Sequence, residues 1–163
     1  MAQPLPWLYP YAAEPVARRG HEVLRPVVTV SIPGSLPTME PSWALVDTGA
    51  ENVLAAAWIA DLAGIDLSAS TDRVLIGIGS QVAEVTFAEV ELRVHAPDDA
   101  KALISWRADV GFVPGWQAPF PLVLGQLGFL DRFTVTFHRG AAMLVLEDWD
   151  VFDVRFGTGP ARG

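Results

Sequence analysis

Short apolar segments separated by Gly- and Pro-rich stretches run along most of the chain. The segment 23–32 is dense in β-branched residues, and 83–94 alternates apolar with charged positions, as half-buried strands do. Further strands are predicted over 43–46, 73–78, 102–113, 122–124, 133–137 and 142–146. Many short strands with one or two short helices are typical of an all-β barrel or sandwich, and not of an alternating βαβ fold.

Two segments have the pattern or length of a helix. Apolar residues recur at helical intervals across 53–62, which predicts a helix with Asn52 as its N-cap and Gly64 as its stop. The segment 126–131 has room for one or two helical turns. The strands on either side of the Gly-rich stretch 77–79 predict a long hairpin with that stretch at its tip.

The two ends of the chain differ from its middle. Residues 1–22 are rich in Pro and aromatic residues, which predicts an irregular N-terminal arm: a mobile tail, a strap or a segment that is cut off. Residues 23–147 contain no internal repeat and no linker, which predicts a single domain. Residues 148–163 then form a C-terminal tail that ends in a Gly-rich stretch.

The composition is apolar and the net charge is negative. Hydrophobic residues make up 51% of the chain and charged ones 18%, against a typical quarter. Such a composition indicates either a surface partly covered by a partner or a large core under a plain surface. The net charge is −8 and no basic stripe is present, so we expect no binding to nucleic acid or to anionic membranes.

Cysteine is absent, which excludes disulfides, thiolate catalysis and zinc-thiolate sites. His21, His95 and His138 show no ligand spacing, so we expect neither a metal nor a cofactor. The first residues show no pattern of a signal peptide, and no apolar run approaches the ~20 residues of a spanning helix. We therefore expect a cytoplasmic protein.

The clearest candidate for chemistry is the tripeptide Asp47-Thr48-Gly49. It directly follows the apolar run 43–46, at the end of a predicted buried strand. A carboxylate in such a place is costly unless it is paired or its pKa is shifted. The tripeptide alone is a modest signal, because Asp and Gly are also common turn residues.

Three stretches carry a resemblance to a known family. Residues 25–32 and 44–54, which surround Asp47-Thr48-Gly49, resemble the first third of a retroviral-type, retropepsin-like aspartic protease. Ile76-Gly77-Ile78-Gly79 is similar to the Gly-rich flap of that family, and 122–130 resembles the strand, Gly and short helix that close its fold. The resemblance covers about residues 23–147 and implies a closed barrel-like fold with a flap hairpin.

The resemblance also implies an assembly and an activity. The family's chemistry needs two carboxyl groups, and this chain has one Asp-Thr-Gly and no Asp-Ser-Gly. It is also too short for a two-lobed, pepsin-like arrangement, so two chains would each bring Asp47 to a twofold axis. Two carboxyls about 3 Å apart hold one proton between them and activate a water molecule against a peptide bond. The expected function is a homodimeric aspartic endopeptidase that acts on peptides or proteins.

Site residues follow from the same resemblance. Thr48 would brace the two active-site loops across the dimer axis, Gly49 would let the substrate backbone pass, and the Gly-rich tip would form a lid. The implied catalytic residues are Asp47, Thr48 and Gly49. The implied substrate-binding residues are Ala50, Glu51, Gly77, Ile78, Gly79 and Leu124. Trp116 and Phe120, in a Pro-rich loop, are further candidates for the wall of a substrate cleft.

One departure from the family leaves alternatives open. The viral enzymes usually have an Arg where this chain has Gln126, and the facing position is Glu51, which suggests a Gln–Glu hydrogen bond in place of an ion pair. The chain is then also compatible with a non-catalytic retropepsin-fold module that dimerises or binds peptides, or with an unrelated β-barrel that binds a small ligand. A further hypothesis is that residues 1–22 occupy the cleft until they are cut off.

Overall fold

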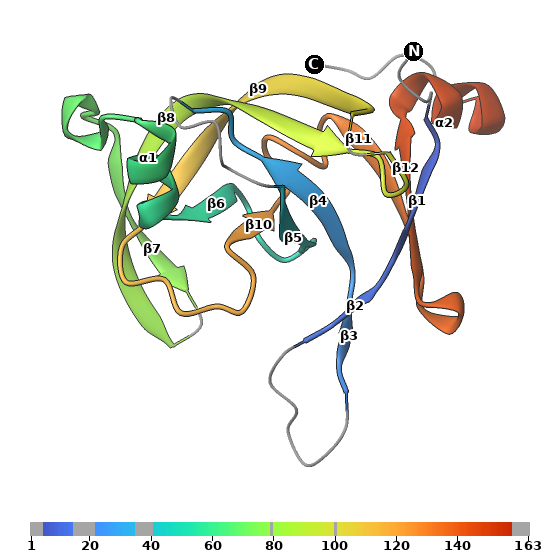
Figure 1. Cartoon of the computed structure of the whole chain (residues 1–163), viewed down its shortest axis with the longest axis horizontal. Helices are drawn as coiled ribbons and strands as arrows, with labels where there is room; N and C mark the ends of the chain where they lie inside the picture. The colour runs from blue at the N-terminus through green and yellow to red at the C-terminus, as the bar shows by residue number, and fades with distance from the viewer. Residues whose placement is uncertain (1–4, 15–21, 35–40, 79, 100, 158–163) are drawn as a thin grey trace.

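The computed structural model describes residues 5–14, 22–34, 41–78, 80–99 and 101–157 of the 163-residue chain. Figure 1 shows strands throughout, with two short α-helices near the surface. In this view the hairpin of β7 (Arg73–Ile78) and β8 (Gln81–His95) lies at one end of the molecule, and the sheet formed by the two ends of the chain lies at the other. The all-β class predicted from the sequence is confirmed.

Six strands close into a barrel in the order β4-β5-β10-β6-β9-β8, and β8 pairs back onto β4. Their bounds are Val27–Ser31 for β4, Ser42–Val46 for β5, Val53–Ala56 for β6, Gln81–His95 for β8, Leu103–Val113 for β9 and Leu122–Leu124 for β10. β7, Arg73–Ile78, pairs with the far part of β8 and forms the predicted hairpin. Closure removes free edges from the barrel strands.

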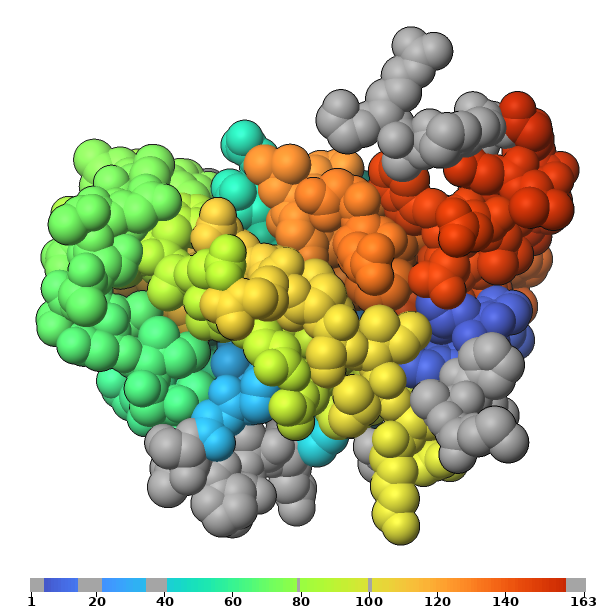
Figure 2. Space-filling model, turned by 90° about the horizontal axis from the view of Figure 1, so that it is seen from above, coloured from blue at the N-terminus to red at the C-terminus, as the bar shows by residue number. Residues whose placement is uncertain are grey.

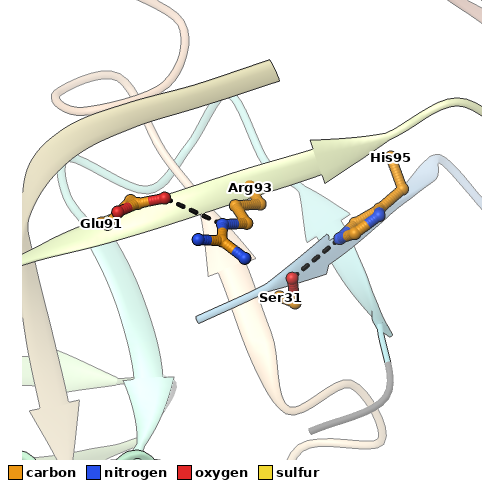
Figure 3. A network of polar contacts seen from close by, with 4 residues as sticks. All are labelled: Ser31, Glu91, Arg93 and His95. Atoms are coloured by element: carbon orange, nitrogen blue, oxygen red, sulfur yellow. Dashed lines mark hydrogen bonds and ion pairs between the residues drawn. The ribbon is translucent and has the colours of Figure 1, made fainter. Parts of the chain in front are cut away.

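The closing seam between β4 and β8 carries a buried polar contact (Figure 3). Ser31 Oγ lies 2.7 Å from His95 Nε2, and both side chains are almost fully buried. Further along β8, Arg93 donates to Glu91 at 2.8 Å, and this hydrogen bond lowers the pKa of the Glu91 carboxyl. Because a buried polar group is costly without a partner, the Ser31–His95 contact favours one register of the seam.

The barrel interior is filled by the apolar faces of its strands. Along β8, Val90, Leu92 and Val94 are buried, while the positions between them are more exposed. The alternation in the sequence therefore predicted the inward face of this strand correctly. At one end of the core, three aromatic rings pack at centroid distances of 5.1 to 5.9 Å, those of Trp106, Phe129 and Phe133.

A second sheet joins the two ends of the chain. It has the order β1-β12-β11, where β1 is Trp7–Pro10, β11 is Phe133–His138 and β12 is Met143–Asp148. In Figure 2 the N-terminal residues, in blue, lie directly against the C-terminal ones, in red. The prediction of an irregular arm is therefore wrong for β1.

The reason is an alternation that the prolines obscure. Trp7 and Tyr9 point inward and are 3% exposed, whereas Leu8 and Pro10 point outward. The Tyr9 hydroxyl donates a 2.6 Å hydrogen bond to the carbonyl oxygen of His95, at the end of β8. The arm thus ties the terminal sheet to the barrel.

The described part of the arm also lies outside the cleft. β2, Ala12–Ala13, pairs with β3, Leu24–Arg25, directly before the barrel begins. None of the residues 5–14 lines the cleft described below. The hypothesis that the arm occupies this cleft is wrong for these residues, and 1–4 and 15–21 lie outside the described residues.

The helices differ from their predicted positions. α1 spans Ala57–Ala63 and ends at Gly64, as predicted, with Gly64 in the left-handed region at φ 70°. It begins four residues later than expected because 53–56 form β6, which is buried between β9 and β10. The segment 126–131 forms turns instead of a helix.

The C-terminal tail and the connections hold the remaining elements. The tail contains a second helix, α2, over Trp149–Phe156. Single 3-10 turns occur at Leu67–Ala69 and Arg139–Ala141. Among the residues described, no helix has the length and apolar character needed to cross a membrane.

Replacing Tyr9 by Phe tests the link between the arm and the barrel. We expect Tyr9→Phe to lower the free energy of unfolding by about 1–2 kcal/mol, because the buried hydrogen bond from the Tyr9 hydroxyl to the His95 carbonyl is lost. Urea denaturation at pH 7 measures this. Tyr11→Phe is the matched control, since no side-chain hydrogen bond of Tyr11 is found within the described residues, and it should change stability little.

The stability of Tyr9→Phe should also depend on pH differently from that of wild type. Burial raises the pKa of the Tyr9 hydroxyl above its ordinary value of about 10. The neutral form is therefore favoured on folding, and its contribution to stability is present below about pH 10 and lost as the pH rises further. We expect wild type to lose more stability than Tyr9→Phe between pH 9 and 11. Parallel losses would contradict this assignment.

Candidate active site

The turn Asp47-Thr48-Gly49 begins where β5 leaves the barrel. β10 lies between β5 and β6, parallel to the first and antiparallel to the second. The Asp47 N–H donates to the carbonyl oxygen of Leu124, the last residue of β10, at 3.0 Å. The turn is thus fixed to the centre of the barrel at its first residue.

The Asp47 carboxylate is oriented by its own turn. Its Oδ1 accepts a hydrogen bond from the Gly49 N–H at 2.8 Å, and the Asp47 carbonyl accepts one from the Ala50 N–H at 3.2 Å. The side chain is half-buried and reaches the wall of a cleft. This arrangement presents one carboxylate in a fixed orientation, with its other oxygen available to a ligand.

The segment after β10 holds the rest of the turn. Gln126 donates from its side-chain Nε2 to the Thr48 carbonyl at 2.7 Å and from its backbone N–H to the Ala50 carbonyl at 2.9 Å. The Leu127 N–H donates to the carbonyl of Glu51 at 2.8 Å. In place of the expected hydrogen bond between the side chains of Gln126 and Glu51, the neutral amide of Gln126 donates a hydrogen bond to the backbone of the turn.

Gly125 permits this close approach. A Cβ atom added at Gly125 would lie 2.6 Å from the Ala50 carbonyl oxygen and closer still to that of Asn52. Asn52 forms a bridge with Leu127 instead of capping a helix, which corrects the prediction for that residue. The Gly after β10 is thus required by backbone packing against the segment that follows the Asp47 turn.

A cleft of about 1110 Å³ opens beside Asp47. Its apolar wall comes from β6, β10, the hairpin and two loops, and consists of Leu54, Val74, Leu75, Ile76, Ile78, Phe87, Trp116, Val123 and Leu127. Its charged lining residues are Asp47, Glu51, Asp72, Arg107, Asp109 and Asp131. The volume and the apolar wall fit several side chains of an extended peptide.

Most of the predicted site residues lie on this cleft. Six of them line it: Asp47, Gly49, Ala50, Glu51, Gly77 and Ile78. Thr48 is exposed and lies outside the lining, and Gly79 lies outside the described residues. Leu124 is fully buried, so the structure does not place its side chain on the cleft; the alternation of β10 gives that place to Val123.

The two aromatic candidates of the Pro-rich loop separate. Trp116 lines the cleft, and its Nε1 donates to the carbonyl of Phe120 at 2.8 Å. Phe120 is buried in a small cluster with Ala12 and Val27, so its expected place on the cleft is wrong. Ala12 belongs to β2 and Val27 to β4, and no local pattern in the sequence indicates that these strands cover Phe120.

Several lining residues were missed by the sequence analysis. Asp72, Arg107, Asp109 and Asp131 reach the cleft from the base of the hairpin, from β9 and from the turn after β10. Each lies in a segment whose local pattern indicates only an exposed position, and strand pairing brings them together. Within the described residues, no group of three or more His, Asp or Glu side chains is arranged to hold a metal ion.

Comparison with known proteins gives a match in structure alone. No family model matches the sequence, and no curated protein matches it. The fold is similar to that of a retropepsin-like aspartic protease from Rickettsia conorii, with a TM-score of 0.52 and 16% sequence identity. This match covers 90% of the present chain and 94% of the other. The chain therefore has the retropepsin-like fold, as its sequence predicted.

Two other solved structures match with lower scores. One is the retroviral protease-like domain of Ddi1 from Leishmania major, with a TM-score of 0.47 and 17% identity, over 77% of this chain and 94% of that one. The other is EIAV protease in complex with the inhibitor HBY-793, with a TM-score of 0.35 and 19% identity, over 68% of this chain and 88% of that one.

Two glycines give a matched test of the packing around the turn. We expect Gly125→Ala to destabilise the protein by about 2 kcal/mol or more, because the added methyl group meets backbone oxygens that cannot move independently. Gly77→Ala adds the same group where no atom lies within 4 Å, and its stability should stay within about 0.5 kcal/mol of wild type. Thermal and urea unfolding measure both variants; equal effects would contradict the packing account.

Proposed function

We propose that this protein is a homodimeric aspartic endopeptidase in which the Asp47 carboxylates of two subunits activate a water molecule. The observation that carries the proposal is the placement of Asp47. It stands in an Asp-Thr-Gly turn, oriented by the Gly49 N–H, on a cleft large enough for a peptide, in a retropepsin-like fold. The function follows from this site, since a fold alone does not define one.

The chemistry requires a second carboxylate close to the first. Two facing carboxyl groups share one proton, so one can take a proton from water while the other donates a hydrogen bond to the scissile carbonyl. The product of water attack is a tetrahedral gem-diol, which collapses to an acid and an amine without a covalent intermediate. Because each chain has one Asp-Thr-Gly, the second carboxylate comes from a second copy.

The terminal sheet supports such an assembly. Its order β1-β12-β11 leaves the outer edge of β11 unpaired within the described residues, and Phe137 on that strand is partly exposed. An unpaired strand edge is a template for another strand. In the proposed dimer this edge lies at the contact between subunits, and the hydroxyl of the exposed Thr48 braces the two turns.

The hairpin of β7 and β8 is the proposed flap. Gly77 and Ile78, near its tip, line the cleft, and a Cβ added at Gly77 would meet no atom within 4 Å. This open space suits a lid that closes on substrate and pairs with an extended peptide as an added strand. We also propose that this peptidase is cytoplasmic, because a chain without cysteine has no disulfides and suits a reducing compartment.

Substitution of Asp47 tests the activity. Wild type should cut an unbiased peptide mixture at some pH between 4 and 7, and Asp47→Asn should lower the rate by at least about a hundredfold, because the water loses its base. Asp61→Asn, on the exposed surface of α1, is the matched control and should keep full activity. Mass spectrometry identifies the cuts. A dimer by sedimentation that cuts nothing would instead support the non-catalytic binding module.

Mixing subunits tests whether the site is shared. We expect activity per wild-type chain to fall to about half when wild type and Asp47→Asn exchange freely at equal amounts, because mixed dimers hold one carboxylate. Sedimentation first establishes that Asp47→Asn forms dimers and exchanges. Unchanged activity per wild-type chain under exchange would show that each subunit works with its own Asp47, and a rise to about one and a half times would show that one Asp47 suffices for a shared site; either result would contradict the proposal.

A further inference from the structure

The charges on the cleft are strongly unbalanced. Five carboxylates line it, those of Asp47, Glu51, Asp72, Asp109 and Asp131, and Arg107 is its one basic lining residue among those described. A cleft lined by one sign of charge beside apolar walls concentrates its field toward an entering ligand. The cleft therefore repels acidic ligands and attracts basic ones.

Arg107 does not correct this imbalance. Its Nε donates to Glu89, on the neighbouring strand β8, in an ion pair. Glu89 is outside the lining, so the cation is neutralised by a group that the ligand does not meet. Arg107 therefore forms no ion pair with the carboxylates that line the cleft.

The register of β8 and β9 places like charges opposite each other. Asp109 is the direct cross-strand partner of Glu89, and both side chains are exposed. Carboxylates directly opposite in a sheet are destabilising, and Arg107 bonds Glu89 and not Asp109. Arg107 thus offsets the charge of Glu89, while Asp109 keeps a carboxylate opposite it and has no side-chain partner of its own among the described residues.

Three of the carboxylates, those of Glu51, Asp72 and Asp109, have no side-chain partner within the described residues. Neither Asp72, at the base of the hairpin, nor Asp109 makes a side-chain hydrogen bond or ion pair there. Asp131 differs, because its Oδ1 accepts a hydrogen bond from the Gly128 N–H at 2.9 Å and so has a structural task. Glu51 belongs to the segment of the Asp47 turn, whereas Asp72 and Asp109 lie outside that turn, and a ligand can engage them without breaking an existing contact.

We propose that the cleft selects peptides that carry a lysine or arginine near the apolar side chains, with Asp72 and Asp109 as specificity-determining residues. The inference rests on the proposed function, because it names the substrate class of the same site. The apolar wall around Phe87 and Trp116 takes the apolar side chains, and the two carboxylates take the basic ones. A long basic side chain suits both, since its stem packs on apolar surface while its charge reaches a rim.

Binding to an uncleaving protein tests the proposal directly. The probe is a set of three fluorescent peptides with one apolar core, flanked by lysines, glutamines or glutamates, measured by anisotropy with the dimeric Asp47→Asn protein. We expect the lysine peptide to bind about three- to tenfold more tightly than the glutamine peptide at low salt. This ratio should shrink toward one near 1 M salt, where charges are screened over about 3 Å.

Neutral variants locate the effect. In the Asp47→Asn background, Asp72→Asn and Asp109→Asn should each lower the ratio between the lysine and glutamine peptides by about two- to fivefold. Asp98→Asn changes the net charge by the same amount at an exposed turn away from the cleft, and it should leave the ratio unchanged. An equal loss in all three variants would attribute the preference to net charge and overturn the assignment.

The outcomes separate this inference from the proposed function. A lysine preference that depends on Asp72 and Asp109 supports it, even if the wild-type protein cuts none of the peptides. Asp47-dependent cleavage with equal binding of the lysine and glutamine peptides would leave the peptidase in place and overturn the charge selection. Tighter binding of the glutamate peptide would overturn it as well.

Discussion

The site depends on one short strand, β10, which is wedged between β5 and β6. Leu124, its last residue, accepts the hydrogen bond of the Asp47 N–H, and Gly125 then packs against the backbone that follows the turn. Because β10 is parallel to β5 and antiparallel to β6, it connects both sides of the Asp47 turn. These three strands therefore fix the Asp47 carboxylate without an ion pair from any described residue, and the neutral Gln126 adds a hydrogen bond to the Thr48 carbonyl.

The terminal sheet has a different role: its buried apolar side chains share the core of the barrel, and the buried Tyr9 hydroxyl adds a hydrogen bond to it. Tyr9 reaches the carbonyl of His95, and His95 in turn contacts Ser31 across the closing seam. The first strand of the chain is thus linked to the seam where β8 pairs with β4. Loss of the N-terminal segment would remove two core aromatic residues as well as this contact, which argues against its being a disposable pro-segment.

Features that a few neighbouring residues determine were predictable from the sequence. The alternation along β8 and the Gly stop of α1 are local, and both were correct. β6 was assigned to a helix because a strand buried on both faces shows no alternation, and its four apolar residues continue into α1. The Asp47 turn was found by its motif, whereas Asp109 reached the cleft through pairing between distant strands, for which no local pattern exists.

Charge distribution and assembly are connected in this molecule. The chain has a net charge of −8, and self-repulsion works against bringing two copies together. The proposed contact at β11 lies at the end of the molecule opposite the hairpin that contributes to the acidic cleft. In the proposed dimer, the carboxylates of the cleft therefore lie outside the β11 contact. At the shared turn, the repulsion between the two Asp47 carboxyls is reduced by the one proton that they hold between them. An excess of negative charge on the cleft is in this way compatible with the proposed dimer, and the basic substrate that we propose would add a counter-charge that the described residues do not supply.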